Sequence, residues 1–319
     1  MKLRNFTKFF TGIALISVLT VGVVISNPHT HSSLVVENKV TSDISWSIDD
    51  KGNIEPTDES KVSGEITIPD TVNGKTVTGI ANNAFDHCSS LISVNFAEGS
   101  KLNSIGEEAF FGCESLKTIA IPSSVTSIGS NAFNDCSSLT SVNFDNDSQL
   151  TSINVAAFYN CSSLTSVNIP GSVTNIGNSA FDSCASLTSV TIPNSVTNIG
   201  KSAFEDCDKL TDVYLSWDEN QIKKLKITGC VFDSASGQIK INFHIPKGMK
   251  ELYIAQTKDW FDGSAVPNWI DDIVPPTPTP TNSSNLGLIL GLIFGSIILI
   301  GIGSYLGYRY YKHRKNSKK

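Results

Sequence analysis

A 23-residue repeat constrains this chain more than any other feature of its sequence. Residues 157–177 read Ala-Phe-x-x-Cys-x-x-Leu-x-x-Val-x-Ile-Pro-x-x-Val-x-x-Ile-Gly, and the same pattern starts again at Ala180. A fixed period of this length is typical of stacked coils, in which each repeat packs only against its neighbours. The sequence therefore predicts a β-rich solenoid, with about six to seven coils of 23–25 residues.

Three columns of residues repeat in step along the chain. Successive Phe residues are separated by 25, 23, 25, 23 and 23 residues. The longer coils have Phe96-Ala97 and Phe144-Asp145 where the shorter coils have Ile-Pro, and they carry two extra residues at that point, which predicts a surface loop there. The columns are Phe85, Phe110, Phe133, Phe158, Phe181 and Phe204; Cys88, Cys113, Cys136, Cys161, Cys184 and Cys207; and Leu91, Leu116, Leu139, Leu164, Leu187 and Leu210.

The position of each residue type in the coil has a physical reason. Leu-x-x-Val-x-Ile/Phe predicts a short strand with its apolar residues inside, and Val-x-x-Ile a second apolar ridge. We expect Ala-Phe on a short helical or 3₁₀ turn, with the ring filling a corner of the core. Gly106, Gly129, Gly177 and Gly200 are expected to adopt backbone conformations that a Cβ forbids, and Asn154, in the same column, to tolerate left-handed geometry.

The chain divides into segments around this solenoid, which we place at residues 84–229. Residues 44–83 have strand-like alternation and are expected to form an N-terminal cap, and residues 230–274 a C-terminal cap, because an uncapped end coil would expose its core. Cys230 falls 23 residues after Cys207, but Phe232 fits the Phe column better, so Cys230 is placed outside the Cys column.

The two ends of the chain predict export and anchoring. Residues 1–26, with three basic residues and then an apolar run, fit a cleaved signal peptide, with an uncleaved anchor as the alternative. Residues 27–43 are interpreted as a leader. Residues 275–285 fit a Pro/Thr-rich stalk, residues 286–308 a membrane-spanning helix, and residues 309–319 a basic cytoplasmic tail. Within the span, Gly287, Gly291 and Gly295 follow the G-x-x-x-G spacing, which raises the hypothesis of a homodimer.

The repeat residues resemble the BspA-like leucine-rich repeat class of surface proteins, over about Ile66 to Val274. Near the end of this range, His244-Ile245-Pro246 and Trp260 are similar to the terminal cap of that class. The resemblance implies a leucine-rich repeat fold and an exported cell-surface protein. It also implies adhesion to host matrix proteins, host cells or other microbes. Members of this class occur in bacteria and protozoa, and the sequence does not choose between the two.

Charge and motif content argue against several functions. The first 26 and last 11 residues hold nine of the 24 Lys and Arg but none of the 30 Asp and Glu, so the part between carries a formal charge of about −15. This disfavours nucleic acid as a partner. One Cys per coil favours buried free thiols over disulfides, because parallel Cβ vectors do not suit a bridge. No metal or cofactor site is predicted: His29-x-His31 has no third ligand nearby, and residues 145–148 are expected to form a solvated loop.

The outward side of the strands is the candidate binding surface. Solenoids use extended surfaces of this kind for protein partners, although short polar side chains also serve simply to keep a sheet soluble. Tyr214 and Trp217 supply aromatic anchors. The candidate residues are Ser93, Asn95, Thr118, Ala120, Ser141, Asn143, Ser166, Asn168, Ser189, Thr191, Asp212, Tyr214 and Trp217.

These observations predict a single-pass cell-surface protein with its N-terminal part outside, acting as a non-enzymatic protein-binding module. An adhesin for an extracellular host or neighbouring-cell protein is the leading hypothesis. A structural coat or spacer protein without a specific receptor is the alternative. A hydrolase has no support, since His87 and His244 lie in no recognisable triad context.

Overall fold

The computed structural model describes residues 44–234, 239–263 and 265–271. These residues belong to one compact unit, and the second unit begins at Val274. The predicted signal peptide, leader, stalk, membrane span and tail lie outside the described residues. Within them, no helix has the length and apolar character needed to cross a membrane.

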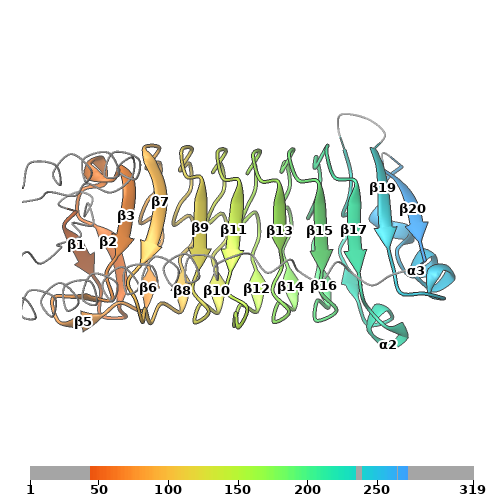
Figure 1. Cartoon of the computed structure of the whole chain (residues 1–319), viewed down its shortest axis with the longest axis horizontal. Helices are drawn as coiled ribbons and strands as arrows, with labels where there is room; N and C mark the ends of the chain where they lie inside the picture. Colours follow the sequence, from red (N-terminus) through yellow and green to blue (C-terminus); the bar gives the residue numbers. More distant parts are fainter. Residues whose placement is uncertain (1–43, 235–238, 264, 272–319) are drawn as a thin grey trace, which may run out of the picture. The chain divides into compact units, whose positions relative to one another are not determined.

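Strands of two to six residues form two nine-stranded sheets (Figure 1). The long-strand sheet is parallel throughout, and its strands follow one another in chain order. Its members are β3 (Gly64–Ile68), β7 (Leu91–Phe96), β9 (Thr118–Ile121), β11 (Ser141–Phe144), β13 (Ser166–Asn168), β15 (Ser189–Ile192), β17 (Asp212–Leu215), β19 (Ile239–His244) and β20 (Ala265–Ile270).

The short-strand sheet forms the other side of each coil. Apart from β1, which runs antiparallel to β2, its strands are parallel. Its members are β1 (Trp46–Ile48), β2 (Asn53–Pro56), β6 (Gly79–Ile80), β8 (Ser104–Ile105), β10 (Ser127–Ile128), β12 (Ser152–Ile153), β14 (Asn175–Ile176), β16 (Asn198–Ile199) and β18 (Lys226–Ile227). A separate hairpin pairs β4 (Thr71–Val72) with β5 (Lys75–Thr76).

The solenoid is longer than the predicted six to seven coils, because both sheets continue into the predicted N-terminal cap and the long-strand sheet continues into the predicted C-terminal cap. Strands β2, β3 and β6 lie before residue 84, and β19 and β20 lie after residue 229. The described helices are short and are found near the two ends: η2 (Glu59–Lys61), α2 (Glu219–Ile222), α3 (Lys250–Gln256) and η3 (Lys258–Trp260). The Ala-Phe corners are isolated turns closed by bonds such as Cys88 N–H to the Phe85 carbonyl, 3.1 Å.

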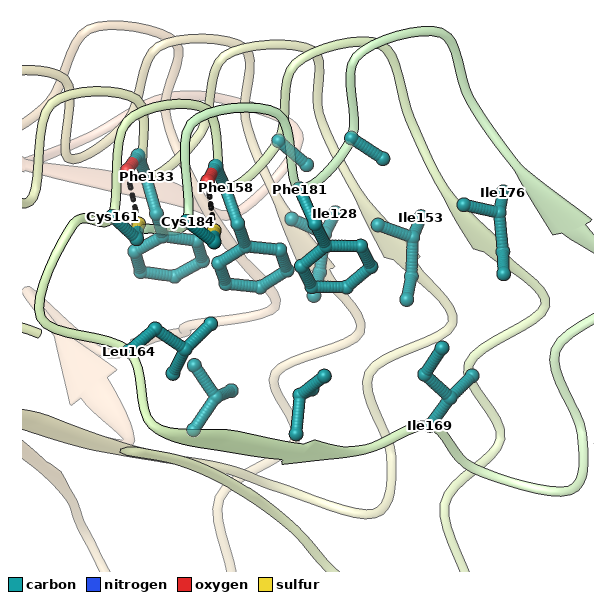
Figure 2. Close-up of a cluster of buried hydrophobic side chains, with 14 of the residues drawn as sticks. Ile128, Phe133, Ile153, Phe158, Cys161, Leu164, Ile169, Ile176, Phe181 and Cys184 are labelled. Atoms are coloured by element: carbon teal, nitrogen blue, oxygen red, sulfur yellow. Dashed lines mark hydrogen bonds between the residues drawn. The ribbon is translucent and has the colours of Figure 1, made fainter. Parts of the chain in front are cut away.

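The Phe column is a continuous stack through the core (Figure 2). Neighbouring rings from Phe85 to Phe204 lie 4.9–5.3 Å apart between centroids and are parallel to within 7°. Phe232 extends the stack at 5.3 Å, which confirms its assignment to this column. Trp46 packs edge-on against Phe85 at one end, and Trp260 packs against Phe232 at the other. The two tryptophans thus cover the apolar stack where the repeats stop.

The six cysteines of the Cys column are buried free thiols beside the ring stack. Each thiol from Cys113 onward donates to the carbonyl of the Phe in the preceding coil, for example Cys161 to Phe133 at 3.2 Å and Cys184 to Phe158 at 3.3 Å (Figure 2). Burial raises the pKa of the Cys88 thiol to about 12, with help from the nearby Glu59 carboxylate. The column therefore packs the core and satisfies backbone carbonyls, and it is not a set of reactive thiolates.

The glycine column is present, but the special backbone conformation expected for it is not. Gly106, Gly129, Gly177 and Gly200 do not have positive φ. A Cβ on Gly129 would instead lie 2.5 Å from the Gly106 carbonyl carbon and the Glu107 nitrogen, so glycine is required by the close approach of adjacent coils. Left-handed residues occur two positions before and after each Phe from Phe85 to Phe204, as at Ala156 and Asn160 around Phe158.

Asn154 also departs from the expectation, since it is not left-handed. Its Nδ2 donates to the carbonyl of Ile128 at 2.8 Å, and its Oδ1 accepts from the Ser152 hydroxyl at 3.0 Å. Its side chain therefore bonds to the preceding coil, where Gly106, Gly129, Gly177 and Gly200 stand in other coils.

Candidate interaction surface

The outward face of the long-strand sheet carries its side chains in two straight columns. The register pairs Ser141 with Ser166 and Ser166 with Ser189 in one column, and Asn168 with Thr191 in the other. Alternation along each strand sends these residues out and the intervening Val or Ile into the core. The structure therefore places the predicted binding residues from Ser93 to Tyr214 on one continuous face.

Over the central coils, this face is made of short polar side chains that do not bond to one another. Asn95, Asn143 and Asn168 are exposed, and Ser141 and Ser189 are half-buried. Cross-coil side-chain bonds are made instead by a neighbouring threonine column, in which Thr165 donates to the Thr140 carbonyl at 3.3 Å. The central face is therefore regular and sterically open.

At the C-terminal end, the face changes to a bonded polar cluster centred on Asp212. One carboxylate oxygen of Asp212 accepts from His244 Nε2 at 2.9 Å and from Asn242 Nδ2 at 3.1 Å. The other oxygen accepts from the Thr211 hydroxyl at 2.7 Å. Asn268 Nδ2 donates in turn to Asn242 Oδ1 at 2.9 Å. Three successive strands, β17, β19 and β20, contribute to this cluster, so its geometry depends on their register.

The protonation of the cluster follows from these bonds. Partial burial alone would raise the pKa of Asp212, but the hydrogen bonds from His244, Thr211 and Asn242 outweigh it and hold the pKa below its ordinary value. Because an ionised carboxylate only accepts, Nε2 is the protonated nitrogen of His244 in this arrangement. Asp212 is therefore a fixed negative charge at neutral pH.

Tyr214 adds a flat aromatic surface to the cluster. Its ring stacks on His244 with a centroid distance of 4.3 Å and an interplanar angle of 12°. Partial burial, together with the Asp212 charge, raises the pKa of the Tyr214 hydroxyl, so it remains protonated. The cluster presents a half-buried stacked pair, Tyr214 and His244, beside an anion, and Tyr is one of the residues enriched at the energetic centres of protein interfaces.

Trp217 does not belong to this surface, which corrects its assignment as an anchor. Its side chain is fully buried, its Nε1 donates to the Val196 carbonyl at 2.8 Å, and its ring packs edge-on against Trp260. The hydroxyl of Tyr253 donates to the Trp217 carbonyl at 2.8 Å. Val213 and Leu215 on β17 point into the core, and position 217 shares their alternation, so the spacing itself places Trp217 on the inner side and not beside Tyr214.

His244, Asn242 and Asn268 complete the surface and were not among the predicted residues. Asn242 pairs with Asp212, His244 with Tyr214, and Asn268 with Asn242. The Asn-Phe-His sequence at 242–244 has a strand-like alternation around the buried Phe243 that could have indicated this pairing. Asp212 and Asn242 are 30 residues apart, which departs from the repeat period, so the period alone did not predict their pairing.

Within the described residues, no three His, Cys, Asp or Glu side chains group in a way that could hold a metal ion. Residues 145–148 form a turn after β11, and the Asp145 carboxylate accepts the backbone N–H of Ser123 at 3.0 Å. His87 is exposed on a turn beside Phe111, before β7 begins, and its ring contacts are with Phe111 and Asp86. On the outward face of the long-strand sheet, the hydrogen-bonded polar side chains are those of the Asp212 cluster.

The chain belongs to the BspA type leucine rich repeat family. The family model matches six copies, over residues 63–149 and 146–252, which is more than half of the chain. This agrees with the repeat columns and the resemblance found in the sequence. No curated protein matches the chain.

Solved structures of leucine-rich repeat proteins align with this chain. The leucine rich repeat protein TpLRR of T. pallidum aligns with a TM-score of 0.51 at 24% identity, over 70% of this chain and 97% of its own. The pneumococcal vaccine antigen PcpA aligns with a TM-score of 0.35 at 16% identity, over 72% and 83% of the two chains. A leucine rich cell surface protein of Faecalibacterium prausnitzii aligns with a TM-score of 0.34 at 18% identity, over 77% and 96%. The first of these alignments supports the leucine-rich repeat solenoid.

Proposed function

We propose that this protein is a membrane-anchored cell-surface adhesin that binds an extracellular protein through the outward face of its long-strand sheet. The observation that carries the proposal is the Asp212 cluster. It is a preorganised group of charged, amide and aromatic side chains at the end of a long, flat and otherwise uniform face. Preorganised side chains lose little entropy on binding, which favours affinity.

The family and the sequence ends support the location. The family is that of BspA type repeats, and the predicted signal peptide, stalk and apolar span at residues 286–308 fit a protein held at the outer surface of a membrane. A spacer of alternating Pro and Thr would hold the solenoid away from the bilayer. The partner is an extracellular protein of a host or of a neighbouring cell.

A non-enzymatic role is consistent with the architecture. Regular stacking gives a surface, whereas catalysis needs polar groups that converge in a pocket. The Asp212–His244 pair lies on the open strand face. The family is typically non-enzymatic, and the proposal assigns no catalytic step.

The test is saturable binding of the purified protein to immobilised matrix proteins and to cell surfaces. The Asp212→Ala, Tyr214→Ala double variant removes the anion and the exposed ring. The matched control, Ser166→Ala with Asn168→Ala, removes two outward side chains from the same columns on β13. We expect saturable binding that falls at least tenfold in the first variant and less than twofold in the control.

Two other outcomes have defined meanings. If binding survives the Asp212 and Tyr214 substitutions, the protein is still an adhesin, but its binding site lies away from the Asp212 cluster. If attachment to every surface tested rises in proportion to protein concentration without saturating, the adhesin proposal is contradicted and a structural coat protein is favoured.

A further inference from the structure

The Asp212 cluster is covered on its β19 side and borders short side chains on its β15 side. Toward β19, His244 bonds to one oxygen of Asp212 and stacks on Tyr214 with ring centroids 4.3 Å apart. Toward β15, the register pairs Asp212 with Ser189 and Tyr214 with Thr191. The outward face therefore rises from short to long side chains at this point, which we call the step: Ser189, Thr191, Asp212 and Tyr214.

The second oxygen of Asp212 can accept a hydrogen bond from a ligand at the step. The Thr211 hydroxyl lies 2.7 Å from this oxygen and 3.2 Å from the carbonyl of Thr188, in the coil of β15. A hydroxyl has one proton to donate, and Thr188 gives its own to the carbonyl of Thr165 in the preceding coil, at 3.2 Å. Thr211 can bond to Thr188 in the same way, so a ligand donor can take the Asp212 oxygen without leaving the hydroxyl unpaired.

Tyr214 turns the second face of its ring toward the step. The ring is within 12° of parallel to that of His244 on β19, so its opposite face looks along the sheet toward β15. Thr191, the neighbour of Tyr214 on β15, is too short to continue the stack. Within the described part of the chain, the Tyr214 hydroxyl makes no hydrogen bond. A planar group above Thr191 would therefore extend the stack of the two rings at the strand spacing of about 4.8 Å.

The charge at the step is negative. Asp212 is the only charged residue among the outward positions of the described strands β11, β13, β15 and β17. Lys209 is exposed beside Asp208 in the turn before β17, and Lys240 is exposed on β19, with β17 between it and the step. The ion-pair partner of Asp212 within the described residues is His244, so neither lysine neutralises it. The formal charge of about −15 between the two ends of the chain also favours the approach of a basic partner.

We propose that the step binds an arginine side chain of the extracellular partner protein. The guanidinium plane stacks on the second face of Tyr214 and donates to the second oxygen of Asp212, and a further N–H donates to the Ser189 hydroxyl. Arginine suits these groups better than lysine, because it is planar, holds its donors in a fixed fork and is more weakly hydrated. The inference rests on the proposed function and names the chemistry that the Asp212 cluster recognises.

The test measures binding of short peptides to the purified full chain by saturation-transfer difference NMR at low salt. The probe is acetyl-Gly-Arg-Gly-amide. One comparison peptide has Lys in place of Arg, and the other has citrulline, which keeps a planar end group but carries no charge. We expect the Arg peptide to bind saturably at millimolar concentration, about threefold more tightly than the Lys peptide and about tenfold more tightly than the citrulline peptide. Its affinity should fall as salt is added.

Matched variants locate the site. Thr191→Tyr places a ring where the guanidinium is proposed to stack and should lower affinity for the Arg peptide at least tenfold; Asn143→Tyr, two strands away in the same column, should change it less than twofold. Asp212→Asn should abolish the preference for Arg over citrulline, and Tyr214→Leu the preference for Arg over Lys. Asp147→Asn, which removes an exposed charge after β11, should leave both preferences unchanged. Circular dichroism checks that each variant is folded.

The proposal is overturned if the citrulline peptide binds as tightly as the Arg peptide, if no peptide binds at millimolar concentration, or if Thr191→Tyr and Asn143→Tyr behave alike. If Asp212→Ala with Tyr214→Ala weakens binding of whole partners but the Arg peptide is not preferred, the adhesin proposal stands and arginine recognition is overturned. If the Arg peptide binds at the step but whole partners bind regardless of those two substitutions, arginine recognition is supported and the proposed function of the cluster fails.

Discussion

The central coils and the C-terminal coils build the same sheet but use its outward face differently. On β11, β13 and β15 the outward side chains are short, and they form no hydrogen bonds with each other. On β17, β19 and β20, the outward side chains of Asp212, Asn242, His244 and Asn268 are joined by hydrogen bonds across three strands.

The difference separates the residues that hold the coils together from the residues that we propose for recognition. In the central coils, the residues that determine the fold lie in the interior: the stacked Phe rings and the glycines that allow adjacent coils to approach closely. At the C-terminal end, the repeat is broken in the core, where Trp217, Tyr253 and Trp260 are buried, and also on the outward face, at the Asp212 cluster. Stability and binding are therefore expected to respond to different substitutions in the two regions.

Phe158→Ala should have the largest effect on stability. The ring stacks between Phe133 and Phe181 at 5.1 and 5.3 Å and is fully buried, so its removal leaves a cavity in the middle of the array. We expect a loss of about 3–5 kcal/mol in the free energy of unfolding. Urea denaturation checks this, with Asn168→Ala, on the outer face of the same coil, as a control that should stay within about 0.5 kcal/mol. Equal losses would contradict the division between inside and outside.

Gly129→Ala should come next. The added Cβ would lie 2.5 Å from backbone atoms of the preceding coil, and backbone cannot move aside as a side chain can. We expect a loss of about 2–4 kcal/mol. Gly171→Ala is the matched control, because nothing lies within 4 Å of its Cβ position and its φ is not positive. A thermal melt in which both variants unfold together would show that coil spacing is not limited by this contact.

Asp212→Asn should have a smaller, pH-dependent effect. The pKa of Asp212 is lowered in the fold, so its ionised form contributes stability above the ordinary value of 3.8, and this contribution is lost as pH falls through the lower folded pKa. The variant should therefore be less stable than the wild type at pH 7, with the difference shrinking toward pH 3. Denaturation midpoints across this range provide the measurement. A difference that is constant with pH would mean that the charge of Asp212 does not contribute.

Asp182→Asn should have the smallest effect, in the opposite direction. Burial raises the pKa of Asp182, whose carboxylate is on a turn at the edge of the central coils. Ionising it costs stability above its folded pKa, so the neutral amide should raise the melting temperature slightly at pH 7. The gain should disappear at low pH, where both side chains are uncharged. A lower melting temperature at pH 7 would show that hydrogen bonds of the ionised form outweigh its burial.

The repeated part of the fold follows from the sequence because each coil repeats the same physical problem. The Phe column, its extension to Phe232 and the inward Val and Ile positions can all be read from spacing. The positions of the glycine column were predicted correctly, but the reason for glycine there was not. The sequence alone does not distinguish a close contact between coils from a positive φ. Left-handed residues such as Ala156 and Ser179 carry no sequence signal.

The Asp212 cluster was less predictable because it depends on β19 and β20, which do not follow the 23–25-residue repeat. Asp212 and Tyr214 follow the outward columns, so spacing alone places them. His244 and Asn242 lie beyond an irregular connection, so their pairing with β17 requires the three-dimensional register. Trp217 was misassigned for a different reason: it shares the inward alternation of Val213 and Leu215, so spacing would have placed its indole in the core, where the structure has it.

Hydroxyl-radical footprinting with a bound partner tests most directly whether recognition lies in the C-terminal deviation. Tyr214 on the strand face and Tyr159 on a turn of a central coil are both half-buried, so they serve as internal probe and control. We predict that the partner lowers the modification rate of Tyr214 and His244 severalfold and leaves that of Tyr159 unchanged. Protection of Tyr159 with no change at Tyr214 would contradict the assignment of the binding surface.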